Sequence, residues 1–291
     1  MGGSNTRPYR HWARLALLVS VLLLPAVGTP TQAEDALDPV LGPAEHTYPD
    51  LQPDVTTVNL SRDFIFDPVS ETFVQDPTTP PDLYFDTRSQ NVGDVPLELL
   101  AEKPDDLMNS SVTQCVSWAD TPVLSLVTDD KAVCRERATV GGFSYHDASG
   151  HNHFHFDDFA DYELRTFNRK GQVDWSSRGL LKTSEKVSFC LQDSKAVGDG
   201  ALPTPRYAGC QPALQGISPG WTDIYPSDID GQQFRDLPVD IPDGLYALVI
   251  NLDPLDRLYE TDNAYNLLVV TVRFYNGGMA ARIVAKTFPN L

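Results

Sequence analysis

Positively charged residues are scarce in this chain. Its 291 residues include 22 Lys and Arg against 40 Asp and Glu, which gives a formal charge of −18. A surface with that excess of carboxylates repels a phosphate backbone, and no run of Lys and Arg offsets it. The composition therefore argues against a nucleic-acid partner and favours cationic partners.

Long hydrophobic runs are also scarce, and the most apolar one lies near the N-terminus, from Leu15 to Val27. It is shorter than the roughly 20 apolar residues that a membrane-spanning helix needs. Three arginines precede it, and the small-residue sequence Thr31-Gln32-Ala33 follows it. This order predicts a secretory signal peptide over residues 1–33, with a membrane anchor as the alternative. We expect a secreted protein that has no membrane attachment after cleavage.

Removal of residues 1–33 would take away Arg7, Arg10 and Arg14 and no acidic residue, which leaves 19 basic against 40 acidic residues and a formal charge of −21. The acidity would then belong wholly to the exported part of the chain.

Cysteines number only four, and no two of them form a C-x-x-C pair, so a zinc-ribbon type of site is not expected. In an oxidising compartment they can form two disulfides in three possible pairings, among which the sequence does not choose. We expect the neighbour pairing, Cys115 with Cys134 and Cys190 with Cys210. Each pair closes a loop of about 20 residues, for which a disulfide contributes on the order of 3 kcal/mol.

Sustained helical periodicity is absent. Short segments of β-branched and aromatic residues alternate instead with turn formers, as in DLYFDTRSQNVGD, VSFCL, GLYALVINLD and NLLVVTVRFYN. We expect a mostly β fold, an antiparallel sandwich-like single domain with long loops. Residues 34–80 are rich in Pro, Asp and Thr and are expected to pack on or lead into the main domain over 81–291.

Histidines gather in one place. Four of the chain's six fall in the ten-residue window HDASGHNHFH, and His151, His153 and His155 form an H-x-H-x-H pattern. Alternate side chains of an extended segment point to one face, so the three imidazoles would share a side. Imidazole is a good ligand for copper, zinc, iron and nickel, which predicts a metal site. The alternative is a solvated His-rich tract without an ordered site.

Several segments in order carry a resemblance to a known family. The stretch GHNHFHFDDFADYEL resembles the copper-binding segment of the lysyl oxidase family. Further similarity to that family follows in EKVSFCLQDS, QGISPGWTDIYPSDID and GLYALVINLDPLDRLYETDNAYN. Together these blocks cover roughly residues 145–275.

The resemblance implies a copper-dependent amine oxidase with His151, His153 and His155 as copper ligands. It also implies that Lys186 and Tyr225 are crosslinked into lysine tyrosylquinone, the organic cofactor of the family. Such an enzyme uses O2 to convert primary amines, including lysine side chains of proteins, to aldehydes with release of hydrogen peroxide and ammonia. A carboxylate would serve as the general base, and the candidates are Asp157, Asp158, Asp161, Asp228 and Asp230.

A calcium site is also implied by the resemblance, because family members can hold calcium between the start of the domain and a Glu-x-Asp stretch near its end. The corresponding ligands are Asp50, the carbonyl of Leu51, Glu260, Asp262 and Asn266. Oxygen ligands of this kind suit a hard cation.

Some positions depart from the family pattern. Gly150, Trp221 and Gly231 stand where relatives carry cysteines, which implies a simpler disulfide set, and Glu185 replaces a common His before the cofactor lysine. A non-enzymatic secreted β-domain that only binds metal is therefore the alternative function. The joint presence of Lys186 and Tyr225 favours the enzyme.

Overall fold

Two of the three larger sheets of the fold lie face to face and enclose most of the core. The computed structural model describes residues 48–118, 134–147, 152–184, 186–198 and 201–289, all within one unit over residues 44–291. The first sheet has the order β1 (Leu51–Ser61), β4 (Asp82–Asn91), β13 (Trp221–Tyr225) and β11 (Lys195–Ala196), and β14 (Gln233–Phe234) also pairs with β4.

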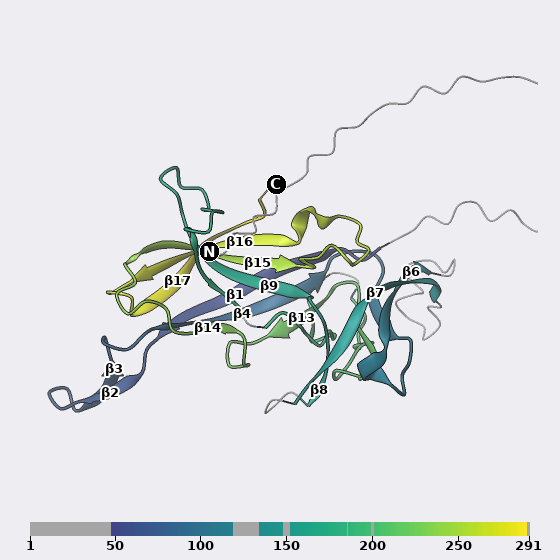
Figure 1. Ribbon diagram of the computed structural model, residues 1–291, viewed down its shortest axis with the longest axis horizontal. Coiled ribbons are helices and arrows are strands. Elements are labelled where there is room, and N and C mark those ends of the chain that lie inside the picture. Colours follow the sequence, from purple (N-terminus) through teal and green to yellow (C-terminus); the bar gives the residue numbers. More distant parts are fainter. Residues whose placement is uncertain (1–47, 119–133, 148–151, 185, 199–200, 290–291) are drawn as a thin grey trace, which may run out of the picture. The chain divides into compact units, whose positions relative to one another are not determined.

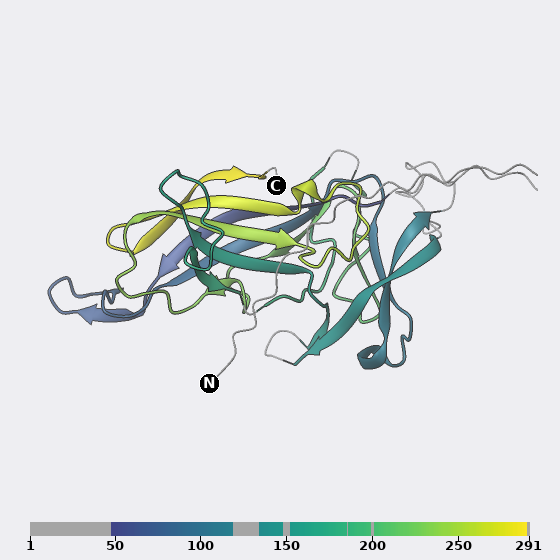
Figure 2. The same ribbon diagram turned by 45° about the horizontal axis from the view of Figure 1, so that its top comes forward.

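The second sheet has the order β10 (Leu180–Thr183), β9 (Ala160–Thr166), β15 (Gly244–Leu252), β16 (Leu267–Tyr275) and β17 (Ala280–Thr287). The first sheet passes beneath it in Figure 1, and the turned view in Figure 2 keeps them adjacent. Alternate residues of β4 are buried, and this period of two is the pattern of a strand with one face on the core.

The third sheet, on the right of Figure 1, has the order β12 (Leu214–Ile217), β5 (Leu97–Ala101), β6 (Ser111–Trp118), β7 (Cys134–His146) and β8 (His153–Phe156). All of the strand pairs in the described residues are antiparallel, which confirms the predicted fold class. Two short 3-10 helices, Leu107–Asn109 and Asn263–Tyr265, are the helical elements of this part of the chain. No helix among the described residues is long and apolar enough to cross a membrane.

A two-stranded hairpin, β2 (Phe64–Asp67) with β3 (Thr72–Gln75), projects from the body of the fold between β1 and β4 (Figure 1). Residues 34–47 lie outside the described residues, as do residues 1–33 of the expected signal peptide. β1, which comes from the segment expected to precede the main domain, pairs along its length with β4.

Both expected disulfides are present, Cys115 with Cys134 and Cys190 with Cys210. The segments expected as strands around Leu83, Leu248 and Val270 are β4, β15 and β16.

The VSFCL segment, by contrast, was wrongly predicted as a strand. Only Phe189 makes a bridge, with Phe156. The next residues leave the sheet because the N–H of Leu191 donates to the side chain of Gln215 and Cys190 is tied to Cys210.

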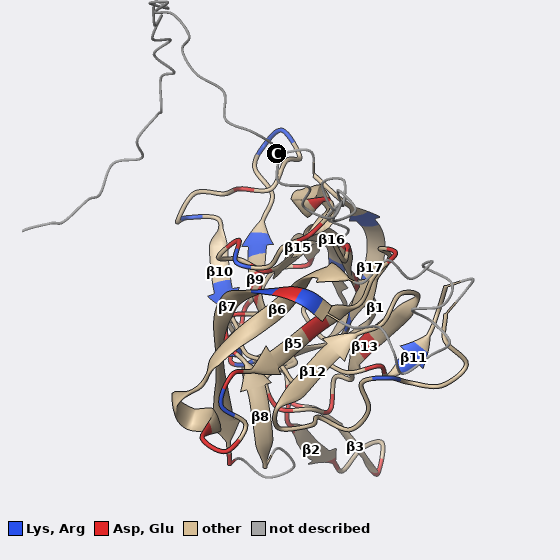
Figure 3. Ribbon diagram, turned by 90° about the vertical axis from the view of Figure 1, so that its right-hand side faces the viewer, with Lys and Arg blue, Asp and Glu red and all other residues tan. Residues whose placement is uncertain are grey.

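Acidic positions are spread over many loops on the face drawn in Figure 3.

Candidate active site

Strands β7 and β8 bring the histidines together. Their antiparallel register sets His146 opposite His153 and Ser144 opposite His155. His155 is almost fully buried, at 1% exposure, and Phe156 beside it reaches the main core. The packing of β8 on the core therefore gives the histidines an ordered setting. His151 lies outside the described residues.

The imidazoles of His153 and His155 point to one place, since their Nε2 atoms lie 2.9 Å apart. Two nitrogens that each bind one metal ion at about 2.0–2.1 Å are separated by about 3 Å, so this pair fits a shared metal. His146 stacks on His155 with ring centres 4.2 Å apart, and its Nε2 lies 2.9 Å from the hydroxyl of Ser188.

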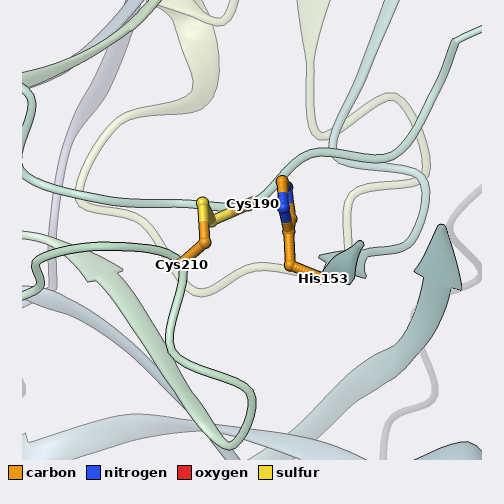
Figure 4. Close-up of side chains that lie close together, drawn as sticks. All are labelled: His153, Cys190 and Cys210. Carbon is orange, nitrogen blue, oxygen red and sulfur yellow. A yellow bond between two sulfur atoms is a disulfide. The ribbon is translucent and has the colours of Figure 1, made fainter. Parts of the chain in front are cut away.

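The sulfurs of Cys190 and Cys210 also approach His153. One ligand atom from each of these three residues lies within 4.8 Å of the others. The two cysteines are joined in a disulfide, as the yellow bond in Figure 4 shows. Thiolates bind metals and disulfide sulfurs do not take that role, so this group is a histidine beside a disulfide.

Lys186 and Tyr225 come from separate segments and meet in the core. The Nζ of Lys186 lies 5.0 Å from the centre of the Tyr225 ring and 5.1 Å from that of Phe189. This Nζ is buried and makes no hydrogen bond to any described residue. Burial lowers the pKa of Lys186 to about 8, against the opposing effect of Asp223 and Asp230.

Gly231 makes room for this lysine. Its φ is +89°, and a Cβ added to it would lie 2.6 Å from the Cβ of Lys186 and 2.7 Å from its Cδ. A larger residue at this position would displace the lysine side chain. The packing of Lys186 therefore explains why glycine stands at position 231, where relatives carry a cysteine.

Tyr225 is held by the backbone of a disulfide-linked residue. Its hydroxyl donates to the carbonyl oxygen of Cys190, and its ring packs edge-on against Phe189 at 4.9 Å between centres. Burial, followed by the charge of Asp223, raises the pKa of Tyr225 well above its usual value. The phenol is therefore protonated at neutral pH, in a fixed orientation.

Asp223 is a buried carboxylate that sequence reasoning missed. It stands two residues before Tyr225 on β13 and is fully buried. The hydroxyl of Ser194 donates to its Oδ1 at 2.9 Å, and burial raises the pKa of Asp223 to about 7. The available signal was the period of two along an extended segment, which sets Asp223 and Tyr225 on one face.

A cavity of about 470 Å³ lies beside Lys186 and Gly231. His146, His155 and Lys186 line it together, and Asp230 and Asp236 line it with Lys182 and Arg235. Asp230 is paired with Arg235 at 3.0 Å. His155 and Lys186 therefore open onto the same space, which is edged by charges of both signs.

The five aspartates that we considered as bases are dispersed. Asp230 lines the cavity, and Asp228 is exposed. Asp158 is paired with Arg257 at 3.0 Å, and Asp157 is partly buried next to it.

Asp161 lies on the face of β9 that points away from the candidate site. Its neighbour Tyr162 packs on Phe189 toward the site, so Asp161 points the opposite way. It lines a separate cavity of about 350 Å³ with Glu163.

The residues expected to bind calcium meet at the start of β1. Glu260 accepts from the N–H of Leu51 at 2.8 Å and from the side-chain amide of Asn266 at 2.7 Å. Asp50 Oδ1 and Asn266 Oδ1 are buried and accept no hydrogen bond from any described residue. Burial raises the pKa of Glu260 to about 8. Two unsatisfied oxygens beside a buried carboxylate are the kind of environment that a hard cation would complete.

Asp262 is the outer member of this group. One of its oxygens caps the second 3-10 helix by accepting from the N–H of Ala264 at 2.8 Å. Within the described residues, the three carboxylates Asp50, Glu260 and Asp262 do not converge as tightly as the His153 group does. The charge of Asp262 nevertheless reaches Asp50 and adds to the effect of burial in raising the pKa of Asp50.

The chain is similar in sequence to known proteins. The lysyl oxidase family profile, described as "Lysyl oxidase", matches residues 126–284, which is more than half of the chain. The protein-lysine 6-oxidase of Gallus gallus is 33% identical over 133 residues, covering 45% of this chain and 28% of that protein. The protein-lysine 6-oxidase of Sus scrofa is 30% identical over 133 residues, 45% of this chain and 48% of that protein.

Lysyl oxidase homolog 1 of Homo sapiens is 33% identical over 127 residues, 43% of this chain and 20% of that protein. The matched region thus spans less than half of each of these relatives. The profile match includes the histidine strand β8, Lys186, Tyr225 and the loop of Glu260. Because the family profile matches more than half of its residues, the chain belongs to the lysyl oxidase family.

Proposed function

We propose that this protein is a secreted, copper-dependent amine oxidase of the lysyl oxidase type. It would oxidise primary amines, including lysine side chains of proteins, to aldehydes and release hydrogen peroxide and ammonia. The observation that carries this proposal is the approach of Lys186 Nζ to the Tyr225 ring, at 5.0 Å, beside the cavity that His155 also lines.

Copper would be held by His151, His153 and His155. The 2.9 Å separation between the Nε2 atoms of His153 and His155 supports this for two of the three ligands. Copper with O2 supplies the oxidation that turns a tyrosine ring into a quinone, to which a lysine amine can add. The residues that would form this lysine tyrosylquinone are Lys186 and Tyr225.

The protein prepares the lysine for that addition. An amine is nucleophilic only when neutral, and a pKa of about 8 gives Lys186 a larger neutral fraction at physiological pH than an exposed lysine has. The aromatic rings of Phe189 and Tyr225 line its burial site and restrict its side chain. Burial and restricted motion both favour bond formation at the tyrosine ring.

We assign proton transfer in this site to Asp223 rather than to the five aspartates considered first. It is fully buried, its charge acts on both Lys186 and Tyr225, and its pKa of about 7 lies near the working pH. A base with such a pKa can both accept and return a proton. Ser194 fixes its orientation through a hydrogen bond to Oδ1.

The negative charge around this site would attract a substrate that carries a primary ammonium group. The chain carries a formal charge of −18, and Asp230 and Asp236 line the cavity. Hydrogen bonds from Gln233 and Arg235 lower the pKa of Asp230, which keeps this carboxylate ionised. The acidic surface would raise the local concentration of cationic substrates, an effect that salt weakens.

Calcium would bind at the start of β1 and tie it to the loop of Glu260. The buried oxygens of Asp50 and Asn266 support this site, with Glu260, Asp262 and the carbonyl of Leu51 as further ligands. Secretion would follow from the signal peptide over residues 1–33.

The decisive experiment is to produce the protein with copper and O2 and to record its visible absorption. We expect a quinone band, loss of that band on reaction with phenylhydrazine, and peroxide release with primary amines. A copper-loaded protein that forms no quinone would contradict the proposal and would support the alternative, a non-enzymatic metal-binding domain.

A further inference from the structure

The β2 and β3 hairpin exposes apolar side chains on both of its faces. In its register Phe66 lies opposite Phe73, so these residues share one face with Phe64, while Ile65 and Val74 share the other. Phe64, Phe66 and Phe73 are 59%, 54% and 70% exposed, and Val69 at the tip is 91% exposed. Monomeric proteins rarely expose apolar side chains in such a continuous group unless the surface binds something.

The hairpin is anchored at its base, so its exposure is not the fraying of a loose loop. Arg62 is only 4% exposed. Its guanidinium donates to the carbonyl oxygens of Val239 at 2.9 Å and Gly278 at 3.3 Å, and to those of Pro77 and Thr79. Its N–H donates to the side chain of Gln75 at 3.0 Å. A buried arginine thus binds both ends of the hairpin to the loops of the second sheet.

Each strand of the hairpin also has an open edge. Within the described residues β2 and β3 pair only with each other. A two-stranded hairpin alone is at best marginally stable in water, and an open apolar edge readily accepts a further extended strand. The geometry therefore suits an extended polypeptide that supplies both backbone hydrogen bonds and apolar side chains.

Charge indicates which polypeptide would bind. Residues 63–76 contain Asp63, Asp67, Glu71 and Asp76 and no Lys, Arg or His. Hydrogen bonds from Val69 and Ser70 lower the pKa of Asp67, and hydrogen bonds from Thr78 lower that of Asp76. These carboxylates repel an anionic lipid surface and a second copy of the same hairpin, and they attract a basic chain.

The hairpin is directly connected to the cavity of the candidate active site. Gln233 and Phe234 on β14 line that cavity and pair with Tyr84 and Leu83 at the start of β4, the strand that follows the hairpin. The N–H of Asp236, another lining residue, donates to Asp82 at 2.8 Å. A polypeptide held on the hairpin would therefore be bound to the chain segment that continues into β4, the strand that pairs with β14 of the cavity wall.

We propose that the β2 and β3 hairpin is a docking site for a basic, extended polypeptide in which lysines alternate with apolar residues. The proposal rests on the proposed function, because it names the class of protein substrate that the oxidase would receive. Docking is carried by Phe64, Phe66 and Phe73 through apolar contact and by the neighbouring carboxylates through attraction.

The test measures binding without turnover. Two fluorescent peptides carry dimethyl-lysine, which keeps the positive charge but cannot condense with a carbonyl. Valine and alanine separate the lysines in the first peptide, and serine and glycine separate them in the second. We expect the purified protein to bind the first at least about tenfold more tightly than the second, as measured by fluorescence anisotropy.

The triple variant Phe64→Ser, Phe66→Ser, Phe73→Ser should lose this preference. The matched control is the double variant Leu255→Ser, Val284→Ser, whose side chains are each 50% exposed elsewhere on the molecule. The control should keep the preference, and both variants should keep the wild-type melting temperature, because exposed side chains contribute little to stability.

A separate variant, Asp67→Asn with Glu71→Gln, tests the charge and should weaken binding of both peptides and reduce the salt dependence. Equal affinity of the wild type for the two peptides would overturn the proposal, as would an unchanged preference in the triple variant. Phenylalanine-dependent binding to phosphatidylcholine and phosphatidylserine vesicles, or phenylalanine-dependent dimerisation, without peptide binding would also overturn it. Because the readout is binding, a protein that forms no quinone but binds the first peptide would contradict only the oxidase.

Discussion

Lys186 Nζ lies 5.0 Å from the centre of the Tyr225 ring, although 39 positions separate the two residues in the sequence. The lysine precedes a bridge to β8, and the tyrosine ends β13 in the first sheet. Their approach depends on how Phe189 packs between the sheets, since the ring of Phe189 contacts both side chains.

Replacement of either partner should abolish the quinone. In Tyr225→Phe the ring loses its hydroxyl and cannot be oxidised to a quinone, and in Lys186→Met no amine is available for the crosslink. Both variants should bind copper as the wild type does. We expect no visible quinone band and at least about a thousandfold loss of amine oxidation. Absorption spectra, peroxide release and copper content would check this, and a chromophore that persists in Tyr225→Phe would contradict the assignment.

Removal of either described histidine should remove copper. His153→Ala and His155→Ala each delete one of the two Nε2 atoms that lie 2.9 Å apart. Loss of groups that merely support a ligand costs about 10-fold to 100-fold in metal affinity, so loss of a ligand should cost at least as much. Copper per chain after dialysis, measured by mass spectrometry, gives the readout. His46→Ala, outside the histidine window, is the control and should retain copper.

Asp223 should impose a pH dependence on stability. Burial raises its pKa to about 7, above the value of about 3.9 in an unfolded chain. Between these values the folded state binds the proton more tightly, so the free energy of unfolding falls as the pH rises. This contribution is fully present below pH 4 and is lost by about pH 7. Its slope is at most about 1.4 kcal/mol per pH unit, the value for one proton.

Urea unfolding of the wild type and Asp223→Asn between pH 4 and pH 8 would measure this contribution. The difference between their two stability curves should slope downward from about pH 4 to about pH 7 and level off above it. Asp240→Asn, at an exposed position, should follow the wild type. Parallel curves for the wild type and Asp223→Asn would show that the carboxyl is not held protonated by burial.

Calcium should stabilise the fold through the start of β1. At a concentration of a hundred times its Kd, a bound ion adds about 2.7 kcal/mol to the free energy of unfolding. We expect a chelator to lower the melting temperature of the wild type and calcium to restore it. Asp50→Asn and Glu260→Gln should each abolish the calcium-dependent rise in melting temperature, whereas Asp240→Asn should keep it. No calcium response in the wild type would refute the site.

The two disulfides should differ in their effect on the candidate site. They link residues 19 and 20 positions apart, so removal of either should cost a similar free energy of unfolding, about 3 kcal/mol. Only Cys190 also accepts the hydrogen bond from the Tyr225 hydroxyl. The pair Cys190→Ala, Cys210→Ala should therefore slow quinone formation, and Cys115→Ala, Cys134→Ala should not. Rates of chromophore appearance after copper addition to copper-free protein would distinguish the two.

The sequence by itself determined the β architecture, and it left the pairing of the four cysteines open while favouring neighbours. The alternation in β4 and the short apolar, β-branched runs in β15 and β16 are local properties, so these strands could be predicted from their own residues. The disulfides follow the nearest-neighbour pairing because each joins the ends of a short loop. The spacing of the histidines indicated a metal site, whereas Lys186 and Tyr225 were identified only by the resemblance to a family.

Only the tertiary structure decided how those residues are placed. It brought Lys186 against Tyr225, enclosed Asp223 with them and turned Asp161 toward a different cavity. It also ended the strand expected at VSFCL after one bridge, because Gln215 and the disulfide partner Cys210 draw the chain away from β8. Burial and charge at a site arise from segments that are distant in sequence. A pKa of about 7 for an aspartate, or of about 8 for a lysine, is therefore a property of the folded core and not of any local pattern.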